Sequence, residues 1–241
     1  MRKTASKPII EAAGHPGPQL SSIAYSAALT AALMLLIFSA AVSIPLLWRG
    51  FYYMQIHSLR LTELTPWSYE EIREAYDEMM DFCMFGAPFG TGVLKWSLEG
   101  MRHFEDCRFL FTLDLKLLSG SAAAVLLLLL AGRSGRRGGF TALRPLGRGP
   151  LFWSGALILV SFVLLALLIR FVNFDRAFVT FHHLFFPGKS NWIFDPAADE
   201  IILILPEIFF SNCAILIASA AAAFSLLFMA LDFLPVFSGR R

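Results

Sequence analysis

The sequence predicts an all-α membrane protein with four transmembrane helices and a small helical cap formed by two outer loops. Three observations predict this fold. Of the 241 residues, 57% are hydrophobic, which is more than one soluble core of this size can bury. The apolar residues gather in four runs of roughly 20 residues, the length that crosses a bilayer as a helix. Basic residues gather in alternate segments between and around these runs, as in multi-span membrane proteins.

The four predicted spans follow one another along the chain, with a tail at each end. We expect one transmembrane domain over residues 23–233, a disordered tail over 1–22 and a second tail over 234–241. The first apolar run is too long for the apolar region of a signal peptide, so we interpret it as a retained helix, with cleavage as the alternative. The spans cover residues 23–48, 109–131, 151–171 and 208–231.

Basic side chains decide the predicted orientation. The link over residues 132–150 carries no acid and both tails are basic, whereas the loop over residues 49–108 has ten acidic and six basic residues. Because cytoplasmic loops are enriched in Lys and Arg, we place both termini and the link in the cytoplasm and the chain in the plasma membrane. Loops 49–108 and 172–207 are then extracytoplasmic. The arginines of the link are Arg133, Arg136, Arg137, Arg144 and Arg148.

The two outer loops are predicted to fold into the cap. Residues 68–83 have apolar side chains at helical spacing and acids in the first turn, which predicts a helix. Residues 94–108 form a second amphipathic stretch that leads into the second span. The aromatic segment before Pro187 is typical of a chain that lies on or dips into the membrane surface.

Histidines are concentrated on the predicted outer face, where imidazole suits proton transfer near neutral pH. His103 and Asp106 share a helix face, so the carboxylate can orient the imidazole; a solvated helix end is the alternative. His182 lies in the aromatic segment and is a second candidate. The alternative is that His182 is a structural histidine at the level of the lipid headgroups. The outer histidines are His57, His103, His182 and His183.

Carboxylates are the other candidates for chemistry. Asp195 and Asp199 lie between the aromatic segment and the fourth span, where ordinary surface carboxylates are the alternative. Asp114 lies inside an apolar run, which predicts either a functional group or a buried polar contact between helices. The sequence contains no GxSxG, SxxK, HExxH or phosphate-binding glycine loop. We therefore expect neither a serine hydrolase nor an ATP-driven machine, and no nucleic-acid partner.

Three alternative functions stay open from the residues alone. A metal-dependent hydrolase can use His103, Asp106, His182 and Asp199 as ligands, although our prediction is a site without metal or cofactor. A disulfide-handling protein can use Cys83 and Cys107, which are both on the outer side, but the CxxC pair typical of that chemistry is absent. A non-enzymatic scaffold or transporter subunit is the third alternative.

Two stretches of the outer loops resemble a known family. Residues 101–107 (MRHFEDC) resemble an H-M-x-D-V element, with Phe104 and Cys107 in place of the usual Met and Val. Residues 178–210 (FVTFHHLFFPGKSNWIFDPAADEIILILPEIFF) resemble a longer aromatic element with W-x-F-D-P at its centre. The acidic helix that carries Tyr76 is similar to that family's first loop. The family is that of the four-helix bacterial membrane proteins that include the lipoprotein intramolecular transacylases.

The resemblance implies an acyltransferase. Its substrates are diacylglyceryl-modified lipoproteins in the outer leaflet of the membrane. The sn-2 acyl chain of the N-terminal cysteine moves to the α-amino group of the same residue, which leaves a lyso-form lipoprotein. No cofactor is implied, and the resemblance does not specify an oligomeric state.

On this basis we assign hypothetical roles to the candidate residues. His182 is the base, His103 is the oxyanion donor or leaving-group acid, and Asp106 orients His103; the two histidine roles can be exchanged. Four aromatic residues line an acyl groove, with aromatic core packing as the alternative. Further candidates for substrate binding are Tyr76, Asp195 and Asp199. The aromatic residues are Phe178, Phe181, Phe185 and Trp192.

Overall fold

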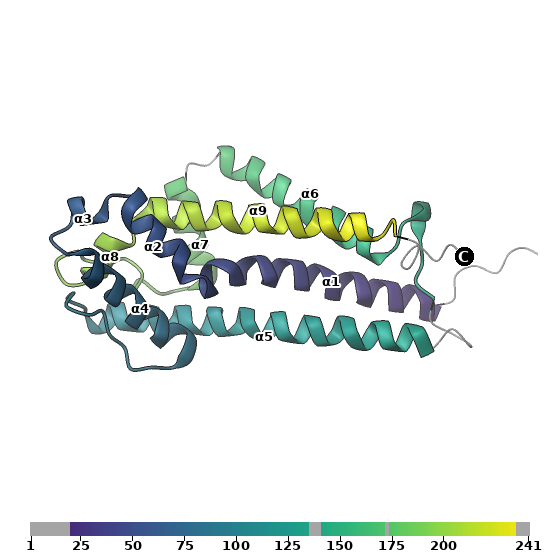
Figure 1. Ribbon diagram of the computed structural model, residues 1–241, viewed down its shortest axis with the longest axis horizontal. Helices are drawn as coiled ribbons and strands as arrows, with labels where there is room; N and C mark the ends of the chain where they lie inside the picture. Colours follow the sequence, from purple (N-terminus) through teal and green to yellow (C-terminus); the bar gives the residue numbers. More distant parts are fainter. Residues whose placement is uncertain (1–19, 135–140, 172–173, 235–241) are drawn as a thin grey trace, which may run out of the picture.

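Four long helices lie side by side in the computed structural model, which describes residues 20–134, 141–171 and 174–234 (Figure 1). All four are long and apolar enough to cross a membrane. No strand occurs in these described residues, so the predicted all-α membrane fold is confirmed. The predicted tail 1–22 falls almost entirely outside the described residues, as does most of the tail 234–241. The long helices are α1 (Leu20–Leu47), α5 (Leu98–Ser134), α6 (Pro150–Phe171) and α9 (Glu207–Leu231).

Helix α1 packs against the other three long helices, and α6 packs closely against α9. A glycine explains the close approach of α6 and α9. A Cβ atom added at Gly155 would lie 2.5 Å from the backbone oxygen of Ser225, so the absence of a side chain lets the two helices meet. In the last turns of α1, Ser43 donates to Asp114 of α5 at 2.7 Å. Asp114 therefore forms the polar contact between helices that was one of its two predicted roles.

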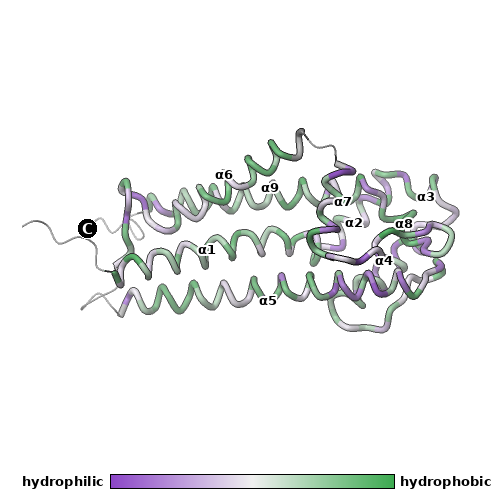
Figure 2. Tube along the Cα trace, turned by 180° about the vertical axis from the view of Figure 1, so that it is seen from behind, coloured by the Kyte–Doolittle hydropathy of each residue, from purple (hydrophilic) through white to green (hydrophobic). Residues whose placement is uncertain are grey.

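Helix α5 is longer than a membrane span requires. Its 37 residues extend roughly 55 Å, against a hydrocarbon core of about 30 Å. The predicted amphipathic stretch 94–108 is therefore not a separate element, because most of it forms the first turns of α5. Figure 2 shows hydrophilic residues along these first turns and in the surrounding short helices, and mostly hydrophobic residues along the rest of the bundle.

The short helices gather around the start of α5 and form the cap (Figure 1). The cap packs around a core that includes Ile72, Ile201 and Ile204, all at most 1% exposed. Its elements are α2 (Arg49–Ser58), α3 (Leu61–Leu64), α4 (Tyr69–Phe85), α7 (Phe174–Phe185) and α8 (Ile201–Ile204).

Helix α4 begins and ends where local sequence requires it. Ser68 accepts from the Glu71 backbone N–H, and the Glu71 carboxylate accepts from the Ser68 N–H at 2.8 Å, which together make a capping box. The helix ends at Gly86, whose φ of 76° is a conformation that favours glycine. Arg49 of α2 forms ion pairs with Asp77, at 3.1 Å, and with Asp81, and so joins α2 to α4.

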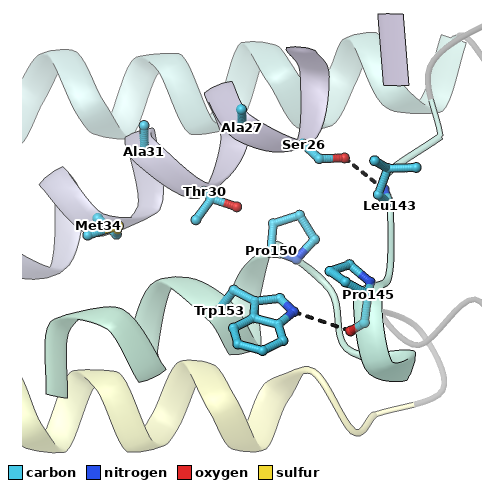
Figure 3. A pocket seen from close by; sticks show the side chains of 9 residues that line it. All are labelled: Ser26, Ala27, Thr30, Ala31, Met34, Leu143, Pro145, Pro150 and Trp153. Carbon is cyan, nitrogen blue, oxygen red and sulfur yellow. Dashed lines mark hydrogen bonds between the residues drawn. The ribbon is translucent and has the colours of Figure 1, made fainter. Parts of the chain in front are cut away.

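Residues 141–150, the longer described part of the 132–150 link, lie at the opposite end of the bundle. Arg144 pairs with the buried carboxylate of Asp232 at 2.8 Å. Beside it, a groove of about 350 Å³ opens between α1 and α6, where Ser26 accepts from the Leu143 N–H (Figure 3). The groove lies far from the cap. Its lining is Ser26, Ala27, Thr30, Ala31, Met34, Leu143, Pro145, Pro150 and Trp153.

Candidate active site

Two imidazoles from separate segments lie close together at the end of the bundle that carries the cap. His103 lies in the second turn of α5 and His182 in the last turns of α7. Their ring centroids are 5.8 Å apart. Both residues are buried, with exposed fractions of 6% for His103 and 7% for His182. The structure therefore brings together the two histidines that sequence analysis singled out from different loops.

His182 is held in one orientation from two sides. Its Nδ1 lies 2.7 Å from the carbonyl oxygen of Phe178, one helical turn earlier. Because a carbonyl only accepts, Nδ1 carries the proton, and in the neutral ring Nε2 keeps its lone pair. Trp192 stacks on the imidazole at 4.7 Å between centroids. Burial lowers the pKa of His182, the hydrogen bond to Phe178 opposes this shift, and His183 adds to it.

His103 has one polar partner and an aromatic environment. Its Nε2 lies 3.4 Å from the Sγ of Cys107, one turn further along α5. Its Nδ1 is buried and has no hydrogen-bond partner within the described residues. The edges of Phe186 and Phe194 contact the ring at centroid distances of 5.0 and 5.5 Å. A buried ring nitrogen without a partner is uncommon and points to a group that bonds only when a ligand is present.

Asp106 does not bond to His103, contrary to the predicted orienting contact. Its carboxylate forms an ion pair with Lys189 and accepts from the side-chain amide of Asn191 at 3.1 Å. Both partners belong to the loop between α7 and α8. The position of Asp106 in the sequence could not predict a contact with this distant loop. Asp106 therefore joins α5 to the loop that also carries Trp192.

Asp199 has a capping geometry at the start of α5. Its carboxylate accepts from the backbone N–H of Ser97 at 2.7 Å and from the Ser97 hydroxyl at 2.8 Å. The N–H of Gly100 in turn donates to the Ser97 hydroxyl. Asp199 thus holds the first turn of the helix that carries His103. Asp195 lies at the surface, where it accepts from the Ala197 N–H within its own loop.

The predicted aromatic residues divide into two groups. Phe178 and Trp192 contact the His182 ring, with centroid distances of 4.2 and 4.7 Å. Phe181 and Phe185 contact each other at 4.5 Å and are nearly half exposed, and Phe181 also contacts the His182 ring at 5.5 Å. All but Trp192 lie on α7, so one helix carries both a ring that packs on the histidine and an exposed aromatic face.

Tyr76 lies in the cap core rather than beside the histidines. It is 3% exposed and stacks on Tyr52 at 3.7 Å between centroids. Tyr52 in turn donates to the carbonyl oxygen of Ile204. His57 is also separate from the pair, since it stacks on Tyr69 of α4. The sequence pattern did not distinguish these aromatic packing positions from substrate contacts.

The ligand set of the metal-dependent alternative is not assembled in the described residues. No group of three His, Cys, Asp or Glu side chains there is close enough to hold a metal ion. Of the four proposed ligands, Asp106 binds Lys189 and Asp199 binds Ser97. The disulfide alternative is also disfavoured, because all three cysteines are free thiols. Burial raises the pKa of the Cys83 thiol to about 12, which keeps it protonated and unreactive.

Several residues of the site were not predicted from the sequence. Phe186 is buried and contacts both imidazoles, and Phe194 packs on His103. Cys107 had been noted as a departure from the family pattern and, with Cys83, as a cysteine of the disulfide alternative, but not as a contact of His103. Its spacing of four residues from His103 on one helix was the signal that could have identified the contact. Phe186 has the same spacing from His182, whereas Phe194 gave no such signal, because its contact with His103 joins distant segments.

Comparisons with known proteins identify the family. A solved structure of the membrane-integral lipoprotein intramolecular transacylase Lit from Bacillus cereus has a TM-score of 0.77 and 23% sequence identity, and the match covers 91% of this chain and 97% of that one. A structure of a single-substitution variant of that protein has a TM-score of 0.73, also at 23% identity, over 91% of this chain and 93% of that one. No curated protein matches. The family model of the lipoprotein intramolecular transacylase Lit matches residues 27–210, so this chain belongs to the Lit family of intramolecular transacylases.

Proposed function

We propose that this chain moves the sn-2 acyl chain of a diacylglyceryl cysteine to the α-amino group of the same lipoprotein, with His182 as the base and His103 as the hydrogen-bond donor. One observation carries this assignment: two buried imidazoles from separate segments lie 5.8 Å apart between ring centroids. Aminolysis of an ester needs a group that accepts the amine proton and a group that stabilises the oxyanion.

The reaction balances without any further reactant. The amine nitrogen attacks the sn-2 carbonyl carbon, and the carbonyl electron pair moves to its oxygen. The amine proton passes to Nε2 of His182, and the oxyanion is stabilised by N–H donation from His103. When the intermediate collapses, the bond to the sn-2 glyceryl oxygen breaks and that oxygen takes up the proton held by His182, which returns the imidazole to its neutral form. The products are an amide on the cysteine and a free sn-2 hydroxyl.

Proximity supplies much of the rate acceleration in this proposal. Amine and ester belong to one lipoprotein molecule, so the enzyme needs only to hold them in an attack geometry. No covalent intermediate is required. Because burial lowers the pKa of His182, its imidazole is neutral near pH 7 and is ready to accept a proton.

The other candidate residues have supporting roles in this proposal. Phe181 and Phe185 present an exposed aromatic face of α7 that suits an acyl chain. Asp106 acts through Lys189 and Asn191, which fix the loop that carries Trp192. Asp195 is exposed on the same loop region and is available to a polar part of the substrate. We assign Tyr76 and Asp199 to cap packing and helix capping rather than to substrate contact.

We place the site on the extracytoplasmic face of the plasma membrane. The cap is at one end of the bundle, and the start of α1, the end of α9 and the described part of the Arg-rich link are at the other (Figure 1). The excess of Arg and Lys in the link and tails supports a cytoplasmic location for that end. The lipoprotein substrate then reaches the cap from the outer leaflet.

Mass spectrometry of a lipoprotein's N-terminal peptide tests the proposal. Cells that lack any such activity are given the wild-type chain, His103→Ala or His182→Ala. We expect acyl migration with the wild type and a loss of at least about a hundredfold in either variant. His57→Ala, which removes a histidine of the cap outside the site, is the matched control. Unchanged peptide masses with a well-expressed wild type would contradict the function, and active histidine variants would contradict the site.

A further inference from the structure

We propose that Cys107 is a positioning residue: its thiol donates to Nε2 of His103 and thereby holds that imidazole in the tautomer whose proton is on Nδ1. This inference rests on the proposed function and assigns the two histidines different roles within it. It starts from the 3.4 Å contact between the Sγ of Cys107 and the Nε2 of His103.

The direction of this hydrogen bond follows from the two groups. A cysteine thiol is ordinarily protonated at neutral pH, and its sulfur is a weak acceptor. The lone pair on an imidazole nitrogen is a much better acceptor than sulfur. The thiol of Cys107 therefore donates its single proton to the lone pair of Nε2. A neutral imidazole that accepts at Nε2 carries its own proton on Nδ1.

The second ring nitrogen of His103 gives independent support. Nδ1 is buried, and no described residue bonds to it. With Cys107 as donor, Nδ1 presents an N–H that is free for the substrate. The opposite tautomer would present a lone pair there and leave the site without an imidazole N–H for the oxyanion.

His182 completes the argument because its own tautomer is fixed. Its Nδ1 proton is committed to the Phe178 carbonyl at 2.7 Å, so its Nε2 is an acceptor. The pair of rings then offers one acceptor, on His182, and one donor, on His103. Ester aminolysis requires this combination. Two acceptors would take the amine proton but would leave the oxyanion unpaired.

The placement of Cys107 suits a positioning role rather than a nucleophilic one. It lies one turn from His103 on the same face of α5, so the two side chains are neighbours on one rigid helix. The thiol contacts the ring edge away from the free Nδ1. In our proposal it touches no reacting atom and acts only through His103.

Nitrogen NMR of histidine-labelled protein tests the tautomer directly. The His103 signals are assigned by their disappearance in His103→Asn. We expect protonation at Nδ1 in the wild type and in Cys107→Ser, which keeps a donor at this position. In Cys107→Val, which removes the donor, we expect the proton to be found mainly on Nε2. A wild-type proton on Nε2, or an unchanged tautomer in Cys107→Val, would overturn the inference.

Kinetics on a synthetic diacylglyceryl-cysteine lipopeptide provide the second readout. We expect kcat to fall about tenfold in Cys107→Val with little change in KM, and Cys107→Ser to recover most of the rate. Cys213→Ala is the matched control, because Cys213 is a half-buried cysteine of α9 outside the histidine site. Equal kcat values in all four proteins would contradict the positioning role. A wild type that moves no acyl chain would refute the proposed function. The NMR measurement of the His103 tautomer needs no turnover, so it tests the positioning role separately.

Discussion

The indole of Trp192 stacks on the imidazole of His182, with 4.7 Å between ring centroids and 29° between the ring planes. The indole is itself fixed, because its Nε1 donates to the carbonyl oxygen of Lys189 at 3.0 Å. Lys189 pairs with Asp106 of α5. A chain of contacts therefore runs from the helix that carries one histidine to the ring of the other.

We predict that Trp192→Ala lowers kcat for acyl migration by about tenfold, because loss of the stacking contact lets the His182 ring depart from its attack geometry. Trp192→Phe keeps an aromatic face and should recover part of the rate. Single-turnover assays on the diacylated lipopeptide measure the change. If Trp192→Ala retained the wild-type rate while its thermal unfolding was unaltered, the stacking contact would have no role in positioning His182.

The rate of acyl migration should depend on pH through His182. The base must be neutral, and burial lowers its pKa, so the rate should rise with pH to a midpoint below about 6.5 and level off by neutral pH. A kcat profile from pH 4 to 8 measures this midpoint. Substitution of the exposed His57 by Gln should leave it unchanged. A midpoint at or above the ordinary histidine value would argue against His182 as the base.

Folding stability should titrate in the same region. In the unfolded chain His182 binds a proton at its ordinary pKa, about 6.5, whereas in the folded chain it does so only at lower pH. The unfolded state therefore binds more protons between the two values. Stability should be complete above about pH 6.5 and fall as the pH drops below it. Thermal unfolding in detergent measures this fall in stability, which should be smaller in His182→Gln than in the wild type. Equal falls in the two proteins would mean that other groups cause the pH dependence.

Gly100 offers a test of the contact between the start of α5 and the loop before α8. A Cβ atom there would overlap the Asp199 carboxylate and approach the Phe194 ring at 3.1 Å. We expect Gly100→Ala to destabilise the fold by about 1–3 kcal/mol and to lower activity, because Phe194 packs on His103.

Gly120→Ala is the matched control for this prediction. Gly120 lies on the same helix, and a Cβ atom there would meet nothing within 4 Å. Its effect should be neutral or stabilising by about 0.5–1 kcal/mol. Chemical denaturation in detergent compares the two variants, and equal stability for both would show that the start of α5 tolerates a side chain.

The ion pair between Asp106 and Lys189 should contribute little to stability but more to activity. Lys189 is about half exposed, so a double-mutant cycle with Asp106→Asn and Lys189→Met should give a coupling energy of about 0.2–1 kcal/mol for unfolding. The same single substitutions should each lower kcat severalfold, since both loosen the loop that carries Trp192. If kcat fell by no more than the loss of folded protein in each single variant accounts for, this prediction would be contradicted.

Features that depend on local pattern could be predicted from the sequence. Long apolar runs indicated the four helices, and apolar spacing with acids in the first turn predicted a helix over residues 68–83, within one residue of the start of α4. The continuity of α5 through residues 98–108 was not predicted, because charged side chains interrupt the apolar pattern while the backbone stays helical. Hydropathy responds to the solvent around a helix, not to where the helix begins.

Features of the site that depend on distant segments were harder to predict. His103 and His182 stood out by residue type, and their convergence was a hypothesis that only the tertiary structure could examine. The expected bond between Asp106 and His103 is absent because the carboxylate meets Lys189 and Asn191 from another loop. Spacing along one helix shows which side chains can meet, but it does not reveal competing partners from elsewhere in the chain.

The aromatic enclosure of the histidines has a consequence for the fate of the ester. A neutral imidazole that can deprotonate an amine can equally activate water, and water is far more abundant than a tethered amine. Phe186, at 4% exposure, occupies the space beside both rings. In the proposed mechanism this covering keeps bulk water from the carbonyl carbon. A smaller side chain at this position would release free fatty acid from the lipopeptide instead of retaining both acyl chains on it.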